Sequence, residues 1–138
     1  MPSVKYFYPI AFGIFILFVG VFVSGVFNLY GLIPHLDKVY HFSGGFALGW
    51  FFYIYLVKNS SIPKFKQFII VLSATCFIAV LWEYAERLST LYSPQYFPIV
   101  GRWFQGGDLN DTLLDILAAI IGASVFWIIN KLLNKLKV

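Results

Sequence analysis

Acidic residues and a histidine gather in three short segments of this 138-residue sequence, at positions 37–41, 83–87 and 108–115. Within each segment they are spaced three or four residues apart, which places their side chains on one face of a helix. Hard divalent cations prefer carboxylate oxygens, and manganese, iron and zinc also accept imidazole. We therefore expect a divalent-metal site, with zinc, manganese or magnesium held by Asp37, His41, Glu83, Asp111 and Asp115.

Neighbouring residues in the same part of the chain could handle protons and anions. Glu86 and Asp108 are the candidates for general acid–base catalysis, because crowded carboxylates hold their pKa values high enough for proton transfer. An anionic head group or phosphate would be held by the basic residues Lys38, Arg87 and Arg102. A metal beside basic side chains predicts a metal-dependent hydrolase or transferase acting on a phosphorylated or lipid-linked molecule.

Each of these residues also has a purely structural interpretation. Asp108 and Asp111 could stabilise the N-terminus of a helix, where carboxylates meet unpaired N–H groups. Glu83 could simply pair with Arg87 four residues later, and His41 could be a neutral, hydrogen-bonded histidine. Asp115 is explained least well in this way. It lies about one turn inside a helix, where an unpaired charge at membrane depth costs about 2.5 kcal/mol or more.

Composition indicates which elements position these segments. The sequence is 60% hydrophobic and only 12% charged, whereas a soluble domain carries roughly a quarter charged residues. The excess apolar surface must face lipid. The net charge of +4 does not indicate nucleic-acid binding, because the lysines stand at the ends of apolar runs and form no stripe.

Four apolar segments stand out, at about 6–29, 39–57, 65–82 and 112–133. Each approaches the ~20 residues that a helix needs to cross ~30 Å of hydrocarbon. Helices are expected because backbone groups in lipid must be satisfied within their own segment. The sequence therefore predicts an all-α, single-domain integral membrane bundle of four transmembrane helices. An aromatic and glycine-rich loop at 84–111 would lie at the level of the lipid head groups.

Basic residues predict how this bundle is oriented and packed. Seven lysines fall at the N-terminus, the second connection and the C-terminus, while three basic residues fall on the other side. Both termini are therefore expected in the cytoplasm of a multi-pass cell-membrane protein, with the acidic residues outside. Gly45 and Gly49 on the second helix, with Gly122 among small residues on the fourth, predict that these helices pack closely and bring their polar ends together.

The polar segments also resemble a known group of proteins. The likeness rests on Asp37-x-x-x-His41-Phe42-x-x-Gly45-Phe46, on Glu83-x-x-Glu86, and on Gly107-Asp108-x-x-Asp111-Thr112-x-x-Asp115 followed by Gly122-Ala123. These motifs are similar to those of YjdF-like small inner-membrane proteins and, more distantly, of the VanZ-like family. The resemblance implies the helical membrane fold and the polar positions. The VanZ-like link implies a role near the cell envelope or in a glycopeptide response.

Two other classes of function stay open from the residues alone. A small transporter or channel subunit would need ionisable groups near the membrane midplane, and the centres of the expected helices lack charge. A structural or partner-binding membrane protein would use its acids and bases only to pair with each other. Membrane lipid, an anionic or lipid-linked substrate and further copies of the chain are the partners that the sequence allows.

Overall fold

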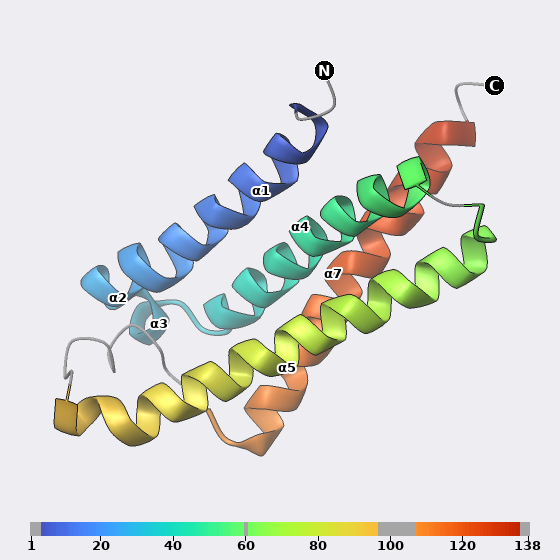
Figure 1. Ribbon diagram of the computed structural model, residues 1–138. Coiled ribbons are helices and arrows are strands. Elements are labelled where there is room, and N and C mark those ends of the chain that lie inside the picture. The colour runs from blue at the N-terminus through green and yellow to red at the C-terminus, as the bar shows by residue number, and fades with distance from the viewer. Residues whose placement is uncertain (1–3, 60, 97–106, 136–138) are drawn as a thin grey trace.

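The computed structural model describes residues 4–59, 61–96 and 107–135, and the elements of these ranges are helices (Figure 1). The first arm of the bundle consists of three consecutive pieces, which are α1 (Val4–Leu17), the π-helix η1 (Phe18–Val23) and α2 (Ser24–Phe27). After it come the short helix α3 (Leu29–Leu32) and the long helices α4 (Leu36–Asn59), α5 (Lys64–Tyr96) and α7 (Leu109–Lys135).

Within the described residues, three helical segments are long and apolar enough to cross a membrane, namely Lys5–Phe27, Lys64–Tyr92 and Leu109–Asn134. Helix α4 has a comparable length of 24 residues, but glycines, tyrosines, a serine and His41 dilute its apolar side chains. It packs against α1, α5 and α7, and its Gly45 and Gly49 lie against the backbone of Ala119 and Ala123 on α7. The expected all-helical membrane architecture is therefore met, with three of the four expected spans identified by length and composition.

The helices extend further than the apolar runs predict. The third helix was expected at 65–82, yet α5 continues to Tyr96, so the first part of the expected 84–111 loop is helical. The sequence after Trp82 contains no glycine and no proline before Pro94, so nothing stops the helix where the hydropathy falls. Residues 97–106 of the expected loop lie outside the described residues.

The first helix, expected as one element at 6–29, is interrupted near its end. The backbone widens into the π-helix and then turns at Asn28, which has a left-handed φ of 52°. A π-turn disturbs the regular carbonyl pairing, and two hydroxyls compensate for it. Ser24 donates to the carbonyl of Val19 at 3.1 Å, and Tyr30 donates to the carbonyl of Gly20 at 2.6 Å.

Helices α4 and α7 approach each other through glycines, as the sequence predicts. A Cβ atom at Gly45 would collide with the carbonyl group of Ala119, and one at Gly122 would collide with the carbonyl oxygen of Phe42. The two helices run in the same direction, so their N-terminal ends lie together. In Figure 1 these ends lie opposite the start of α1 and the end of α7. Close backbone contact thus brings the acidic segments of α4 and α7 side by side.

Candidate metal centre

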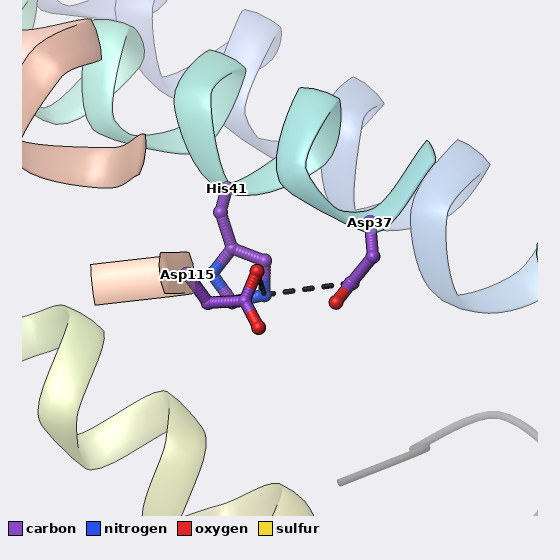
Figure 2. Close-up of side chains that lie close together, drawn as sticks. All are labelled: Asp37, His41 and Asp115. Atoms are coloured by element: carbon purple, nitrogen blue, oxygen red, sulfur yellow. Dashed lines mark ion pairs between the residues drawn. The ribbon is translucent and has the colours of Figure 1, made fainter. Parts of the chain in front are cut away.

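His41 stands where three helices meet. Its Nε2 atom lies 3.6 Å from Asp37 Oδ1 on α4, 3.6 Å from Glu83 Oε1 on α5 and 3.9 Å from Asp115 Oδ1 on α7. Figure 2 shows the imidazole ring directed toward the carboxylates of Asp37 and Asp115. The His41 side chain is only 8% exposed. One nitrogen atom is therefore surrounded by three carboxylates in an almost closed space.

Two of these carboxylates are deeply buried. Glu83 is 6% exposed and Asp115 is 1% exposed. The Oε1 atom of Glu83, which faces His41, has no hydrogen-bond partner among the described residues. A buried carboxylate oxygen without a hydrogen bond is costly, because it has lost the hydrogen bonds of water and gained none from the protein. This oxygen atom points to a proton donor or a cation as the missing partner.

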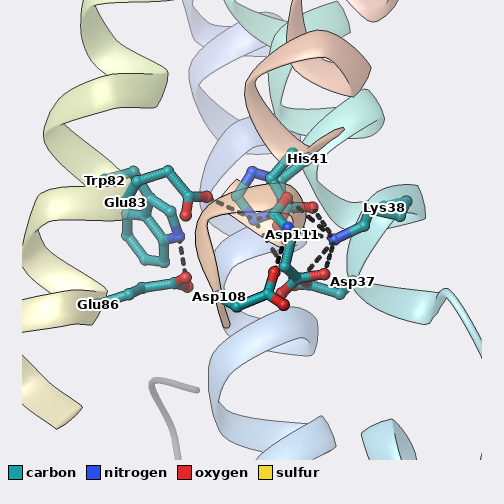
Figure 3. A network of polar contacts seen from close by, with 9 residues as sticks. Asp37, Lys38, His41, Trp82, Glu83, Glu86, Asp108 and Asp111 are labelled. Carbon is teal, nitrogen blue, oxygen red and sulfur yellow. Dashed lines mark hydrogen bonds and ion pairs between the residues drawn. The ribbon is translucent and has the colours of Figure 1, made fainter. Parts of the chain in front are cut away.

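Lys38 holds the other side of the cluster together, as Figure 3 shows. Its Nζ atom lies 2.5 Å from Asp111 Oδ1, 2.7 Å from Asp115 Oδ1 and 3.6 Å from Asp37 Oδ2. Burial lowers the pKa of Lys38, but the contacts with Asp111 and Asp115 outweigh it and raise that pKa above its ordinary value. Lys38 is therefore a cation that binds α4 to α7, and it lies beside the oxygens that face His41.

The pKa of Asp37 is lowered below its ordinary value. Burial alone would raise it, but the contact with His41, the charge of His41 and the Lys38 ammonium together reverse that direction. Asp37 is therefore ionised and available as an oxygen donor. The described centre contains five carboxylates and only one lysine and one histidine, so it has an excess of negative charge. A further cation would balance it.

Glu86 extends the centre along α5. Trp82 donates its indole N–H to Glu86 Oε1 at 2.7 Å, and Glu86 is only 7% exposed. Two overlapping sets among the described residues could hold a metal ion, with ligand atoms within 4.8 Å of one another. One set is Asp37, His41 and Asp115, and the other is His41, Glu83 and Glu86. His41 belongs to both sets, so it is the natural centre of coordination.

The distances from His41 Nε2 to the three oxygens are close to those of a metal centre, although no set among the described residues brings Glu83 within 4.8 Å of both His41 and either Asp37 or Asp115. Bonds of about 2.0–2.2 Å in a tetrahedral arrangement hold ligand atoms roughly 3.3–3.6 Å apart. The three oxygens lie 3.6–3.9 Å from His41 Nε2, which is long for a hydrogen bond and a few tenths of an ångström wider than that arrangement. A mixed set of imidazole and carboxylates suits zinc or manganese.

The remaining predicted residues lie further out. Asp111 reaches the centre through Lys38, and Asp108 is exposed and accepts a hydrogen bond from the Asp111 backbone N–H at 2.9 Å. This bond is the helix-capping contact that was one of the two interpretations of Asp108. Arg87 is exposed, and Arg102 lies outside the described residues.

The sequence motifs did not predict that two aromatic residues, Trp82 and Tyr30, belong to the centre. Trp82 precedes Glu86 by four residues, a spacing that could have indicated their contact on one helix face. Tyr30 lies beside Asp37 because the chain turns at Asn28, and asparagine, which adopts the left-handed conformation more readily than most residues, could have indicated that turn. Burial, and then the Asp37 carboxylate, raise the pKa of Tyr30, so its hydroxyl remains a neutral donor.

Known proteins place this chain in a family. Residues 5–135 match a family described as "Predicted membrane protein (DUF2238)". This chain belongs to that family. The match covers the helices of the bundle except for Val4, the first residue of α1, and includes every residue of the metal centre. It supports the membrane assignment that the composition predicts.

One curated relative offers a second comparison. A protein of Thermotoga maritima, described as uncharacterized, is 34% identical over 105 residues, which make up 72% of this chain and 50% of the relative. The chain therefore spans about half the length of the curated relative that it matches. No solved structure matches this chain.

Proposed function

We propose that this protein binds a divalent cation with His41, Asp37, Glu83 and Asp115 and acts on or binds a phosphorylated or lipid-linked molecule of the cell envelope. The observation that carries the proposal is the convergence of three carboxylates from three helices on His41 Nε2. The buried Oε1 atom of Glu83, which has no hydrogen-bond partner among the described residues, points in the same direction. Zinc, manganese or magnesium bound there would polarise a phosphoryl oxygen and activate water.

The surrounding residues would handle protons and bind the anionic head group. Glu86 is a general base or a further ligand, because it lies beside His41 and is oriented by Trp82. Asp111 is a further ligand only if its carboxylate leaves the Lys38 ammonium that it contacts, and Asp108 is a second acid–base candidate at the rim. Positive charge for an anionic head group comes from Lys38, Arg87 and Arg102.

The same proposal includes a topology. Helix α4 crosses the membrane as the fourth span, enclosed by α1, α5 and α7. Both termini lie in the cytoplasm, which the excess of lysines at that end supports. The metal centre then opens on the extracytoplasmic side. The resemblance to the VanZ-like family supports a role at the cell envelope.

Metal analysis of the purified protein tests this function. We expect close to one manganese or zinc ion per chain after loading, and a large thermal stabilisation. A ligand at a hundredfold excess over its Kd stabilises a folded protein by about 2.7 kcal/mol. His41→Asn should abolish both the bound metal and the stabilisation.

His35→Asn is the matched control. His35 is the other histidine of the chain, is exposed, and has a left-handed φ of 59° that asparagine tolerates. This variant should bind metal as the wild type does. A wild-type protein that takes up no manganese, zinc or magnesium, or a His41→Asn variant that binds them unchanged, would show that the proposed function is wrong.

A further inference from the structure

An apolar cavity of about 480 Å³ leads away from the metal centre between α1, α4 and α5. Apolar and small side chains form most of its wall, while Asp37, His41 and Glu86 line its polar end. Along α4 it reaches from Asp37 to Phe51, a distance of about 20 Å at the helical rise. Its volume falls within the range of about 300–1,000 Å³ that small-molecule sites occupy.

A second cavity, of about 270 Å³, adjoins the first and is more polar in character. Tyr30, Asp37 and Glu86 line both cavities. Lys38 and Asp111 line only the second one. The protein thus offers a long apolar space that continues, past the metal centre, into a polar chamber. An occupant that fits both must be apolar along most of its length and polar at one end.

Local sequence keeps the apolar space open. A Cβ atom at Gly44 would meet nothing within 4 Å, although Gly44 lies in the cavity wall. The π-helix forms part of the same wall near the polar end, through Gly20 and Val21. π-turns widen a helix and often occur at functional sites. The glycine on α4, which has no side chain, and the widened π-helix η1 therefore both line this cavity.

We propose that this cavity binds the hydrocarbon tail of a membrane amphiphile whose phosphate monoester head group enters the polar chamber. This inference rests on the proposed function and narrows its substrate to lipid phosphates, as opposed to soluble phosphate esters. A polar occupant would lose its hydrogen bonds along the apolar wall. Each methylene group of a hydrocarbon tail instead gains roughly fourfold in affinity.

Binding of hexadecyl phosphate tests the inference. The protein is reconstituted in phosphatidylcholine nanodiscs and loaded with Mn²⁺, and retention of the tritiated probe is measured against empty discs. Gly44→Phe places a ring in the cavity and should weaken binding at least about tenfold, because it displaces two or more methylene groups. Ile121→Phe is the control, because Ile121 is 47% exposed and outside the cavity wall.

A second measurement separates this inference from the metal centre. Mn²⁺ affinity, followed by electron paramagnetic resonance, should be equal in wild type, Gly44→Phe and Ile121→Phe. If Mn²⁺ binding is intact but Gly44→Phe binds hexadecyl phosphate like the wild type, the tail assignment is overturned and the proposed function stands. Binding of ethyl phosphate as tight as that of hexadecyl phosphate also overturns it.

Two further outcomes complete the test. A wild-type protein that binds none of Mn²⁺, Zn²⁺ and Mg²⁺ overturns both the proposed function and the tail assignment. If Gly44→Phe does not fold, Gly44→Leu fills less of the same space and should still weaken binding of hexadecyl phosphate several-fold. Unchanged binding in a folded Gly44→Leu protein would count against the tail assignment in the same way.

Discussion

Helix α4 presents Gly45 toward α7 and the adjacent Gly44 toward the cavity beside α1. A Cβ atom at Gly45 would collide with the backbone of Ala119, whereas one at Gly44 would meet nothing within 4 Å. Two neighbouring glycines thus serve opposite purposes. One allows two backbones to touch and fixes the metal centre, and the other leaves a space beside that centre empty of side chains.

The polar contacts on the two sides of α4 also differ, because charged groups meet on one side and neutral groups on the other. Toward α7, the Lys38 ammonium is bound by two aspartates. Toward the first arm of the bundle, the contacts are between neutral groups, such as the hydroxyls of Ser24 on α2 and Tyr40 on α4, which lie 2.9 Å apart. Metal ligands must be held within about 0.5 Å of their working positions, and close packing with ion pairs achieves this. No metal ligands have to be held in fixed positions on the α1 side. Looser packing there suits a surface that binds a flexible hydrocarbon tail.

Among substitutions that test the difference between the two sides of α4, Lys38→Met is expected to lower stability the most. It removes the cation between α4 and α7 and leaves the carboxylate of Asp115, which is 1% exposed, with only the more distant His41, at 3.9 Å, as an ion-pair partner. Breaking a buried ion pair by removing one member costs about 3–5 kcal/mol. Thermal unfolding in detergent should show that loss.

Lys64→Met supplies the control for Lys38→Met, because Lys64 is exposed at the start of α5 and should tolerate the change within about 0.5 kcal/mol. Adding Asp115→Leu to Lys38→Met should recover much of the stability, since no buried charge then remains unpaired there. Equal unfolding temperatures for Lys38→Met and Lys64→Met would mean that the ion pairs do not hold α4 to α7.

The second effect tests the two glycines directly. Gly45→Leu forces α4 and α7 apart and should cost about 1–3 kcal/mol or more, as overpacking of a close contact does. Gly44→Leu should leave stability unchanged or raise it by up to about 1 kcal/mol, because leucine favours a helix more than glycine does. Thermal unfolding of the two variants side by side measures the difference. A Gly44→Leu protein as unstable as Gly45→Leu would contradict the open space on the α1 side.

Much of the α7 side could be predicted from the sequence. The sequence predicts a close helix pair from Gly45, Gly49 and Gly122, because small residues at four-residue intervals leave a flat surface on a helix. Spacings of three and four residues then place Asp37 with His41 and Asp111 with Asp115 on shared faces. These are periodic, local signals, and a helix converts them into positions in space without help from other elements.

The α1 side could not be predicted in this way. The cavity exists because α1, α4 and α5 leave space between them. Such a space depends on how three separate helices pack, so no pattern within one segment predicts it. The π-helix at Phe18–Val23 has the same apolar composition as the ordinary helix before it. The extent of α5 was missed for a related reason, because hydropathy reports the apolar run and not the residue at which a helix ends.

The smallest effect is expected at the exposed edge of the α7 side. Asp108 accepts a hydrogen bond from the Asp111 backbone N–H, so Asp108→Ala should cost about 1 kcal/mol of stability. Asparagine caps a helix as well as aspartate does, so Asp108→Asn should unfold at the wild-type temperature. Because Asn cannot exchange a proton, turnover of a lipid phosphate by Asp108→Asn separates the two interpretations of this residue. Wild-type turnover would leave Asp108 as a cap alone, and lost turnover at full stability would assign it to acid–base catalysis.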